Sequence, residues 1–123
     1  MKNAIQNFNI PVVEFERAVQ FYSTLLNYEI QTTDFNGIKL GFFACDHENG
    51  GVGGTLLSDP SATPSKMGTM VFLHAGEDLQ QALDRMPDTG DVVVPKSPLG
   101  PNMGFFAIFD DSEGNRVGLF STQ

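Results

Sequence analysis

Apolar and polar residues change period along the chain in a recognisable order. Near the start they alternate, which predicts a strand over residues 5–12, with Phe8, Ile10 and Val12 on one face. From Phe15 to Leu26 the apolar residues recur every three or four positions, which predicts an amphipathic helix over residues 14–26. Three strands are predicted next, over 28–33, 37–43 and 52–57, separated by Asn-Gly turn sequences.

The same order of elements returns after residues 59–67, a Pro- and Ser-containing segment that we interpret as a linker. A strand is predicted over 69–75. A short helical stripe from Leu79 to Met86 follows, with Asp78 and Gln81 placed as a capping box and Pro87 ending the helix. Three more strands are predicted over 92–94, 105–110 and 116–120.

The chain is therefore expected to form one α+β domain, residues 1–123, made of two βαβββ modules at 1–58 and 68–123. Each module has one helix, which covers one face of its four-stranded sheet. Set side by side, the two sheets form a curved mixed sheet, a cup with the helices on its outer face. Concave surfaces of this kind bind small molecules.

Charge and cysteine content exclude several classes of function. The net charge is −8, and the seven Lys and Arg residues are scattered singly, so neither nucleic acid nor a membrane surface is an expected partner. No apolar stretch approaches the length that spans a bilayer. Cys45 is the single cysteine, which excludes an intrachain disulfide and a multi-cysteine metal site. We expect a cytoplasmic protein.

Both ends of the chain resemble the vicinal oxygen chelate superfamily, which includes glyoxalase I, extradiol dioxygenases and bleomycin-resistance proteins. The opening NFNIPVVEFERAVQFYSTLLNYEI is similar to its first strand and helix, and GFFAIFDDSEGNRVGLFS to its final hairpin. The sequence looks most like predicted enzymes related to lactoylglutathione lyase. The resemblance implies the fold and leaves the reaction open.

Metal-dependent members of that superfamily take one ligand from the first strand and one from the last strand of each half. The matching positions here are Asn7, Thr69, a position near Gly54 and a position near Gly118. None is His, Glu, Asp or Cys, the side chains that bind divalent transition metals well. We therefore expect neither a metal site nor another cofactor, and glyoxalase or dioxygenase chemistry is disfavoured.

The expected ligand site lies on the concave face. Phe8, Ile10, Val12, Met70 and Phe72 are assigned to the face that receives the helices, so their alternates point into the cup. The candidate ligand-binding residues are Asn7, Asn9, Thr69, Val71, Phe106 and Phe120.

Two further groups contain side chains that can react. Cys45-Asp46-His47 brings a thiol near an imidazole, which is typical either of a solvated loop or of a reactive pair. His74 is either a core or rim residue or a catalytic base.

Three classes of function fit these observations. The first is a protein that binds a small organic molecule in the cup without metal. The second is a metal-independent lyase or isomerase, and the third is a dimeric module without catalytic activity. We also expect a homodimer, because open sheet edges favour association.

Overall fold

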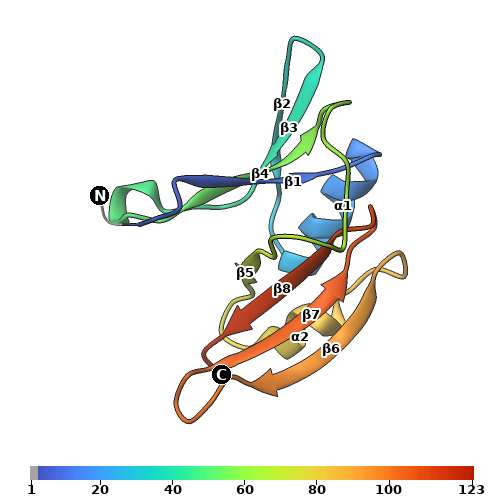
Figure 1. Ribbon diagram of the computed structural model, residues 1–123. Coiled ribbons are helices and arrows are strands. Elements are labelled where there is room, and N and C mark those ends of the chain that lie inside the picture. The colour runs from blue at the N-terminus through green and yellow to red at the C-terminus, as the bar shows by residue number, and fades with distance from the viewer. Residues whose placement is uncertain (1–2) are drawn as a thin grey trace.

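The computed structural model describes residues 3–123 and contains two βαβββ modules in an α+β arrangement, as expected (Figure 1). The elements in chain order are β1 (Asn7–Pro11), α1 (Phe15–Leu26), β2 (Gln31–Phe35), β3 (Ile38–Phe42), the short 3₁₀ helix η1 (His47–Asn49), β4 (Gly53–Ser58), β5 (Phe72–His74), α2 (Leu79–Asp84), β6 (Asp91–Pro98), β7 (Phe105–Asp110) and β8 (Arg116–Ser121).

Both sheets have the same topology. The first has the strand order β1-β4-β3-β2 and the second β5-β8-β7-β6. In each, the first and last strands of the module run parallel in the sheet, and the other neighbours are antiparallel. The equivalence extends to single residues: Asn9 pairs with Thr55 in the first sheet, as Phe72 pairs with Gly118 in the second.

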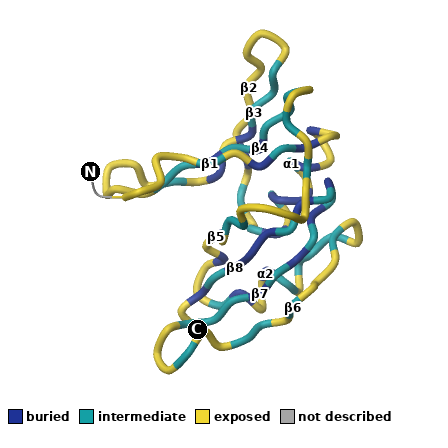
Figure 2. The backbone as a smooth tube through the Cα atoms, viewed as in Figure 1, coloured by how far each residue is buried: buried dark blue, intermediate teal, exposed yellow. Residues whose placement is uncertain are grey.

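Each helix covers one face of its sheet and leaves the other face open. In the first sheet, a Cβ added at Gly41 would contact Phe15 and Val19 of α1, which places Gly41 on the covered face. In the second sheet, Leu73 and Leu119 are buried on the side of α2. The buried residues follow this helical side, whereas the tips of both sheets are exposed (Figure 2).

The two modules share one core. Phe21 of α1 contacts Phe109 of β7 with ring centroids 6.0 Å apart, and the fully buried Tyr22 contacts both rings. Arg85, which ends α2, donates two hydrogen bonds to the carbonyl oxygen of Leu25 at the end of α1. The helical side of the first module thus packs on the second module.

Polar residues of the turn between β7 and β8 lock this junction. Asp111 accepts a hydrogen bond from Tyr22 Oη at 2.7 Å, and Asn115 donates to the carbonyl oxygen of Pro11 at 2.7 Å. Glu113 reaches the residues just before α1 and accepts from the backbone N–H groups of Val13 and Glu14. The sequence predicts this segment only as a turn, and its long-range role is a finding of the structure.

Element boundaries differ modestly from the expectations. Strand β5 is limited to three residues, whereas β6 continues to Pro98 through a segment that the sequence suggests is loop. This is tolerated because β6 is an edge strand, where proline costs no ladder hydrogen bond on its outer side. Asp78 caps α2 as predicted. Its carboxylate accepts a hydrogen bond from the N–H of Gln80, one residue before the Gln81 of the expected capping box.

Candidate functional site

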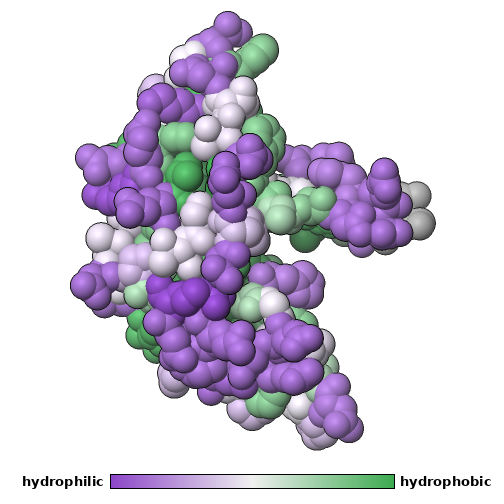
Figure 3. All heavy atoms as spheres, turned by 180° about the vertical axis from the view of Figure 1, so that it is seen from behind, coloured by the Kyte–Doolittle hydropathy of each residue, from purple (hydrophilic) through white to green (hydrophobic). Residues whose placement is uncertain are grey.

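A cavity of about 970 Å³ lies where the first module's strand β1 and residues 43–52 pass the start of β5. From behind, this part of the first module projects from the body as an arm, with apolar atoms where it joins (Figure 3). Asn7, Thr69 and Val71, three of the six expected site residues, line the cavity, and so do Phe72 and His74. Its volume suits an organic ligand.

The open face of the first sheet has a neutral polar pair on β1 and β4 beside apolar residues of β3. Asn9 Oδ1 accepts a hydrogen bond from Thr55 Oγ1 at 2.7 Å, across the β1–β4 pair. Beside Thr55 on the same face is Phe42, whose residue surface is 42% exposed. Asn7 lies two residues before Asn9 and therefore on this face. Both asparagines lie on the predicted face.

The open face of the second sheet carries a cluster of rings, which we call the aromatic shelf: Phe72, His74, Phe106 and Phe120. The Phe72 and Phe106 centroids are 6.5 Å apart, and those of His74 and Phe120 are 5.7 Å apart. Phe106 and Phe120 lie on the open face as expected. Phe72 is 49% exposed, and its ring covers Gly118, where a Cβ would overlap it.

The expected phase of β5 is wrong by one residue. Leu73 and Ala75 are buried and Val71 packs against the core, so these residues face α2. Phe72 and His74 lie on the open face, where the sequence pattern predicted Thr69 and Val71. Val71 therefore reaches the cavity from its core side, and Thr69 reaches it from the segment before β5. The aromatic shelf gains two members that sequence reasoning assigned elsewhere.

The residues at the superfamily's metal positions do not fit a metal. Asn7 lies on the open face, and the phase of β5 places Met70 on the equivalent face in place of Thr69. In the last strands Thr55 and Gly118 occupy the open face, while Gly54 lies under the Phe8 ring on the helical side. Among residues 3–123, no three His, Cys, Asp or Glu side chains cluster as metal ligands. An amide, a thioether, a hydroxyl and a glycine make a poor donor set.

Cys45 lines the cavity, and His47 lies beside Cys45. Cys45 Sγ is 3.6 Å from His47 Nδ1, within contact distance for sulfur, and Cys45 is half-buried. Cys45 lines the cavity, so the pair is placed beside the candidate site. Within residues 3–123, no side-chain hydrogen bond orients a third group toward this pair.

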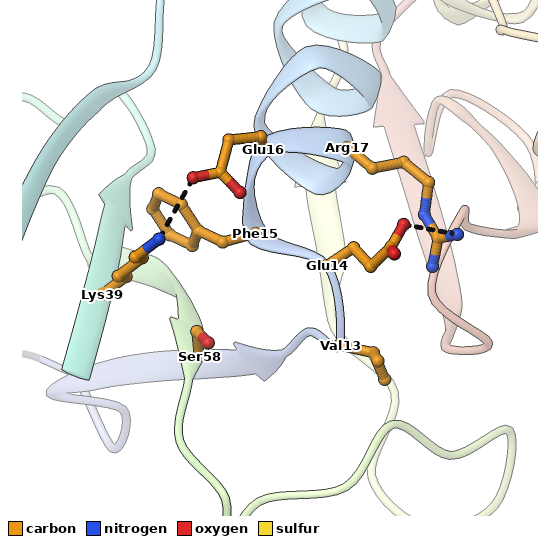
Figure 4. Close-up of a pocket in the computed structure, with 7 residues that line it drawn as sticks. All are labelled: Val13, Glu14, Phe15, Glu16, Arg17, Lys39 and Ser58. Carbon is orange, nitrogen blue, oxygen red and sulfur yellow. Dashed lines mark hydrogen bonds and ion pairs between the residues drawn. The ribbon is translucent and has the colours of Figure 1, made fainter. Parts of the chain in front are cut away.

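A second, smaller hollow of about 430 Å³ lies at the start of α1 and has a different character (Figure 4). Its charged side chains pair with one another: Lys39 with Glu16 at 3.1 Å, and Arg17 with Glu14 at 3.1 Å. Arg17 also bonds the fully buried carboxylate of Glu113 at 2.7 Å. These charges already have partners, so we interpret the hollow as part of the junction between modules.

Comparison with known proteins identifies the family. The sequence profile of the Glyoxalase/Bleomycin resistance protein/Dioxygenase superfamily matches residues 4–119, and the chain belongs to this superfamily. A search of curated protein sequences gives no significant match.

Solved structures with the same fold include antibiotic-related proteins and enzymes. TnmS3, an antibiotic binding protein from Streptomyces sp. CB03234, is 22% identical with TM-score 0.62, and the match covers 100% of this chain and 99% of TnmS3. FosX, a fosfomycin resistance protein from Listeria monocytogenes, is 14% identical with TM-score 0.69, covering 100% and 94%. Glyoxalase I from Zea mays is 13% identical with TM-score 0.68, covering 95% of this chain and 44% of the maize chain. At these identities the likeness concerns the fold.

The helices in the described part of the chain are all too short or too polar to cross a membrane.

Proposed function

We propose that this protein binds a small organic molecule against the open faces of its sheets, without the metal chemistry of its superfamily. The observation that carries the proposal is the aromatic shelf, a group of partly exposed rings continuous at Phe72 and His74 with a cavity of about 970 Å³. Aromatic walls with few polar groups are typical of organic-ligand sites. The fold shared with an antibiotic binding protein supports the same class of function.

A binding role is favoured over catalysis by the chemistry on the open faces. His74 is the one titratable member of the aromatic shelf, and Asn9 and Thr55 are neutral and bonded to each other. Asp110 and Arg116, at the far end of the second sheet, bond one another at 2.8 Å. General acid–base catalysis needs a positioned acid or base within reach of a reacting group, usually tuned by neighbours. His74 instead packs edge-to-face against the Phe120 ring.

The same faces support a homodimer. The chain exposes 7619 Å², whereas a compact monomer of 13.4 kDa exposes about 6,500 Å². The excess of about 1,100 Å² is similar to the roughly 800 Å² that each partner buries in a standard interface. Exposed apolar side chains on the open faces, among them Phe42 and Phe72, contribute to this excess.

We further infer that the open face of the first sheet of one subunit covers the aromatic shelf of its partner. Within one chain, the open face of the first sheet does not cover the open face of the second sheet. Neither face therefore forms a closed site alone. A two-fold arrangement of this kind closes after two subunits and creates two equivalent sites. Each site then combines hydrogen-bonding groups from Asn9 and Thr55 with rings from the partner subunit.

A thermal-shift screen against metabolites and antibiotics tests the binding proposal. A ligand at a hundred times its dissociation constant stabilises the native state by about 2.7 kcal/mol. A compound found this way should lose its effect in Asn9→Ala and Phe120→Ala, and keep it in Val92→Ala, which trims an exposed side chain opposite buried Phe109 on the helical side of the second sheet. If changes at Cys45 or His47 abolish binding while Asn9→Ala and Phe120→Ala leave it intact, the proposed site is wrong.

Light scattering tests the dimer. At micromolar concentration we expect twice the 13.4 kDa chain mass, and the mass of a single chain would contradict the proposal.

A further inference from the structure

The aromatic shelf has a defined size. Its rings occupy two rows across the second sheet: Phe72 in the row with Gly118, and His74, Phe120 and Phe106 in the next row. Three neighbouring strands span about 10 Å, and residues two apart on a strand are about 7 Å apart. These dimensions match a molecule of two or three fused rings.

Gly118 lets the Phe72 ring join the shelf. Because Gly118 has no side chain, the Phe72 ring lies over it on β8, edge-to-face with the Phe106 ring at 66°. A Cβ at this position would force Phe72 upright. Rings in this tilted arrangement present faces and edges to a planar partner, the geometries that aromatic pairs prefer.

The lysines of both sheets are directed away from this site, and the charged pair on the open face, Asp110 and Arg116, is bonded to itself at 2.8 Å. Lys39 of β3 bonds Glu16 of α1, on the helical face. Lys96 of β6 lies over the Phe105 ring and bonds Asp78 at the start of α2, also on the helical face. A charged ligand would lose its hydration at the shelf without gaining an opposite charge, which is costly. A neutral ligand avoids this cost.

His74 supplies the polar contact at one edge. Its ring meets Phe120 at 80°, and no hydrogen bond from His74 to residues 3–123 occupies its nitrogens. A neutral imidazole has one donor and one acceptor nitrogen, so it pairs with a hydroxyl group at the rim of a flat ring system.

We propose that the ligand is a neutral, planar molecule of two or three fused aromatic rings with a hydroxyl group at its edge, stacked on the aromatic shelf and hydrogen-bonded to His74. This rests on the proposed function and adds the class of ligand to it. An aliphatic molecule of the same size would fill the space but forgo the ring contacts, and an anionic one would also meet the net charge of −8.

Isothermal titration at pH 7 with four matched probes tests the proposal. 2-Naphthol has the proposed features, decahydro-2-naphthol lacks planarity, 2-naphthalenesulfonate adds a charge, and 2-methoxynaphthalene lacks the hydroxyl proton. We expect 2-naphthol to bind at least about 10-fold more tightly than the decahydro and sulfonate probes. Its advantage over 2-methoxynaphthalene should shrink to near unity in His74→Leu.

Protein variants locate the site. Phe106→Leu and Phe120→Leu keep an apolar side chain and should weaken 2-naphthol at least about 3-fold, with little effect on decahydro-2-naphthol. Val92→Ala, on the helical side of the second sheet, should leave both unchanged, and thermal unfolding of each variant checks that it is folded. Equal affinities of the planar and saturated probes, both weakened by the shelf variants, would overturn the planar class while the proposed binding function stands. Absence of binding by all four probes would overturn the ligand class too, and the library screen then judges the proposed function separately.

Discussion

Replacement of Glu113 by Gln is the sharpest test of how the two modules are held together. The Glu113 side chain is 0% exposed, and its carboxylate accepts four hydrogen bonds. The donors are the N–H groups of Val13 and Glu14 at 2.8 and 2.7 Å, Arg17 Nε at 2.7 Å and Ser112 Oγ at 2.8 Å. Glu14, at the N-cap of α1, makes no side-chain cap bond, and Glu113 instead binds the backbone N–H groups of the two residues just before the helix.

The expected loss of stability follows from these bonds. Hydrogen bonds to a charged group contribute about 1.5–3 kcal/mol each, against about 0.5–1.5 for neutral ones. Gln has the same shape but one acceptor oxygen, and its amide N–H₂ opposes at least one of the donors. Because the four bonds share one group, they do not add fully. We expect the free energy of unfolding to fall by about 2–4 kcal/mol, a large part of the roughly 5–15 kcal/mol typical of a domain.

Urea unfolding at fixed protein concentration measures this loss, and Glu14→Gln is the matched control. Glu14 has a side chain that is 63% exposed and pairs only with Arg17 at 3.1 Å, so its replacement should cost at most about 1 kcal/mol. If Glu113→Gln lowers stability no more than Glu14→Gln does, the carboxylate does not hold the modules together and the reasoning is refuted.

The same carboxylate predicts acid sensitivity. Burial raises the pKa of Glu113, but hydrogen bonds from Arg17, Glu14, Ser112 and Val13 outweigh burial and hold the pKa below its ordinary value of 4.5. A carboxyl group with a lowered pKa stabilises the fold above its unfolded pKa, and this contribution is lost as pH falls through the folded pKa. Unfolding free energy should therefore decline below about pH 5 in the wild type and less steeply in Glu113→Gln. Equal slopes would contradict this.

Two further predictions concern the core and the metal positions. Tyr22→Phe removes the buried hydrogen bond to Asp111 and should cost about 1–3 kcal/mol in urea unfolding, because a buried acceptor loses one partner; an unchanged midpoint would show that the bond contributes nothing. Burial, and then the charge of Asp111, raise the pKa of Tyr22 well above its ordinary value, so its phenol should stay protonated in alkaline titration of the folded protein, unlike an exposed tyrosine. Elemental analysis after dialysis against a chelator should find no stoichiometric transition metal, and near one metal per chain would contradict the donor set described above.

Strong periodicity explains what could be predicted from the sequence. The stripe from Phe15 to Leu26 repeats over three turns and gives α1 almost to the residue. In β1 the alternation of Asn7 and Asn9 with Phe8 and Ile10 separates a polar face from an apolar one, so the open face is assigned correctly.

Strand β5 lacks that contrast. Met70, Val71, Phe72 and Leu73 are all apolar, so either phase satisfies the pattern, and the choice depends on which residues α2 covers.

The acidic residues of the β7–β8 turn could not be assigned from the sequence for a different reason. Asp111 and Glu113 have the composition of a solvated turn, and their burial depends on partners 89 to 100 residues away in the chain. Local patterns contain no information on such contacts.

Complementation between two binding-deficient chains tests the central claim most directly. Asn9→Ala and Phe120→Ala chains, each unable to bind the screened compound, are refolded together and titrated with it. If each site combines the first sheet of one subunit with the shelf of its partner, random pairing makes half of the dimers mixed, and one of the two sites in each mixed dimer is intact. The account predicts wild-type affinity at about one quarter of all sites. No recovered site, with light scattering confirming that the mixture is dimeric, would contradict it.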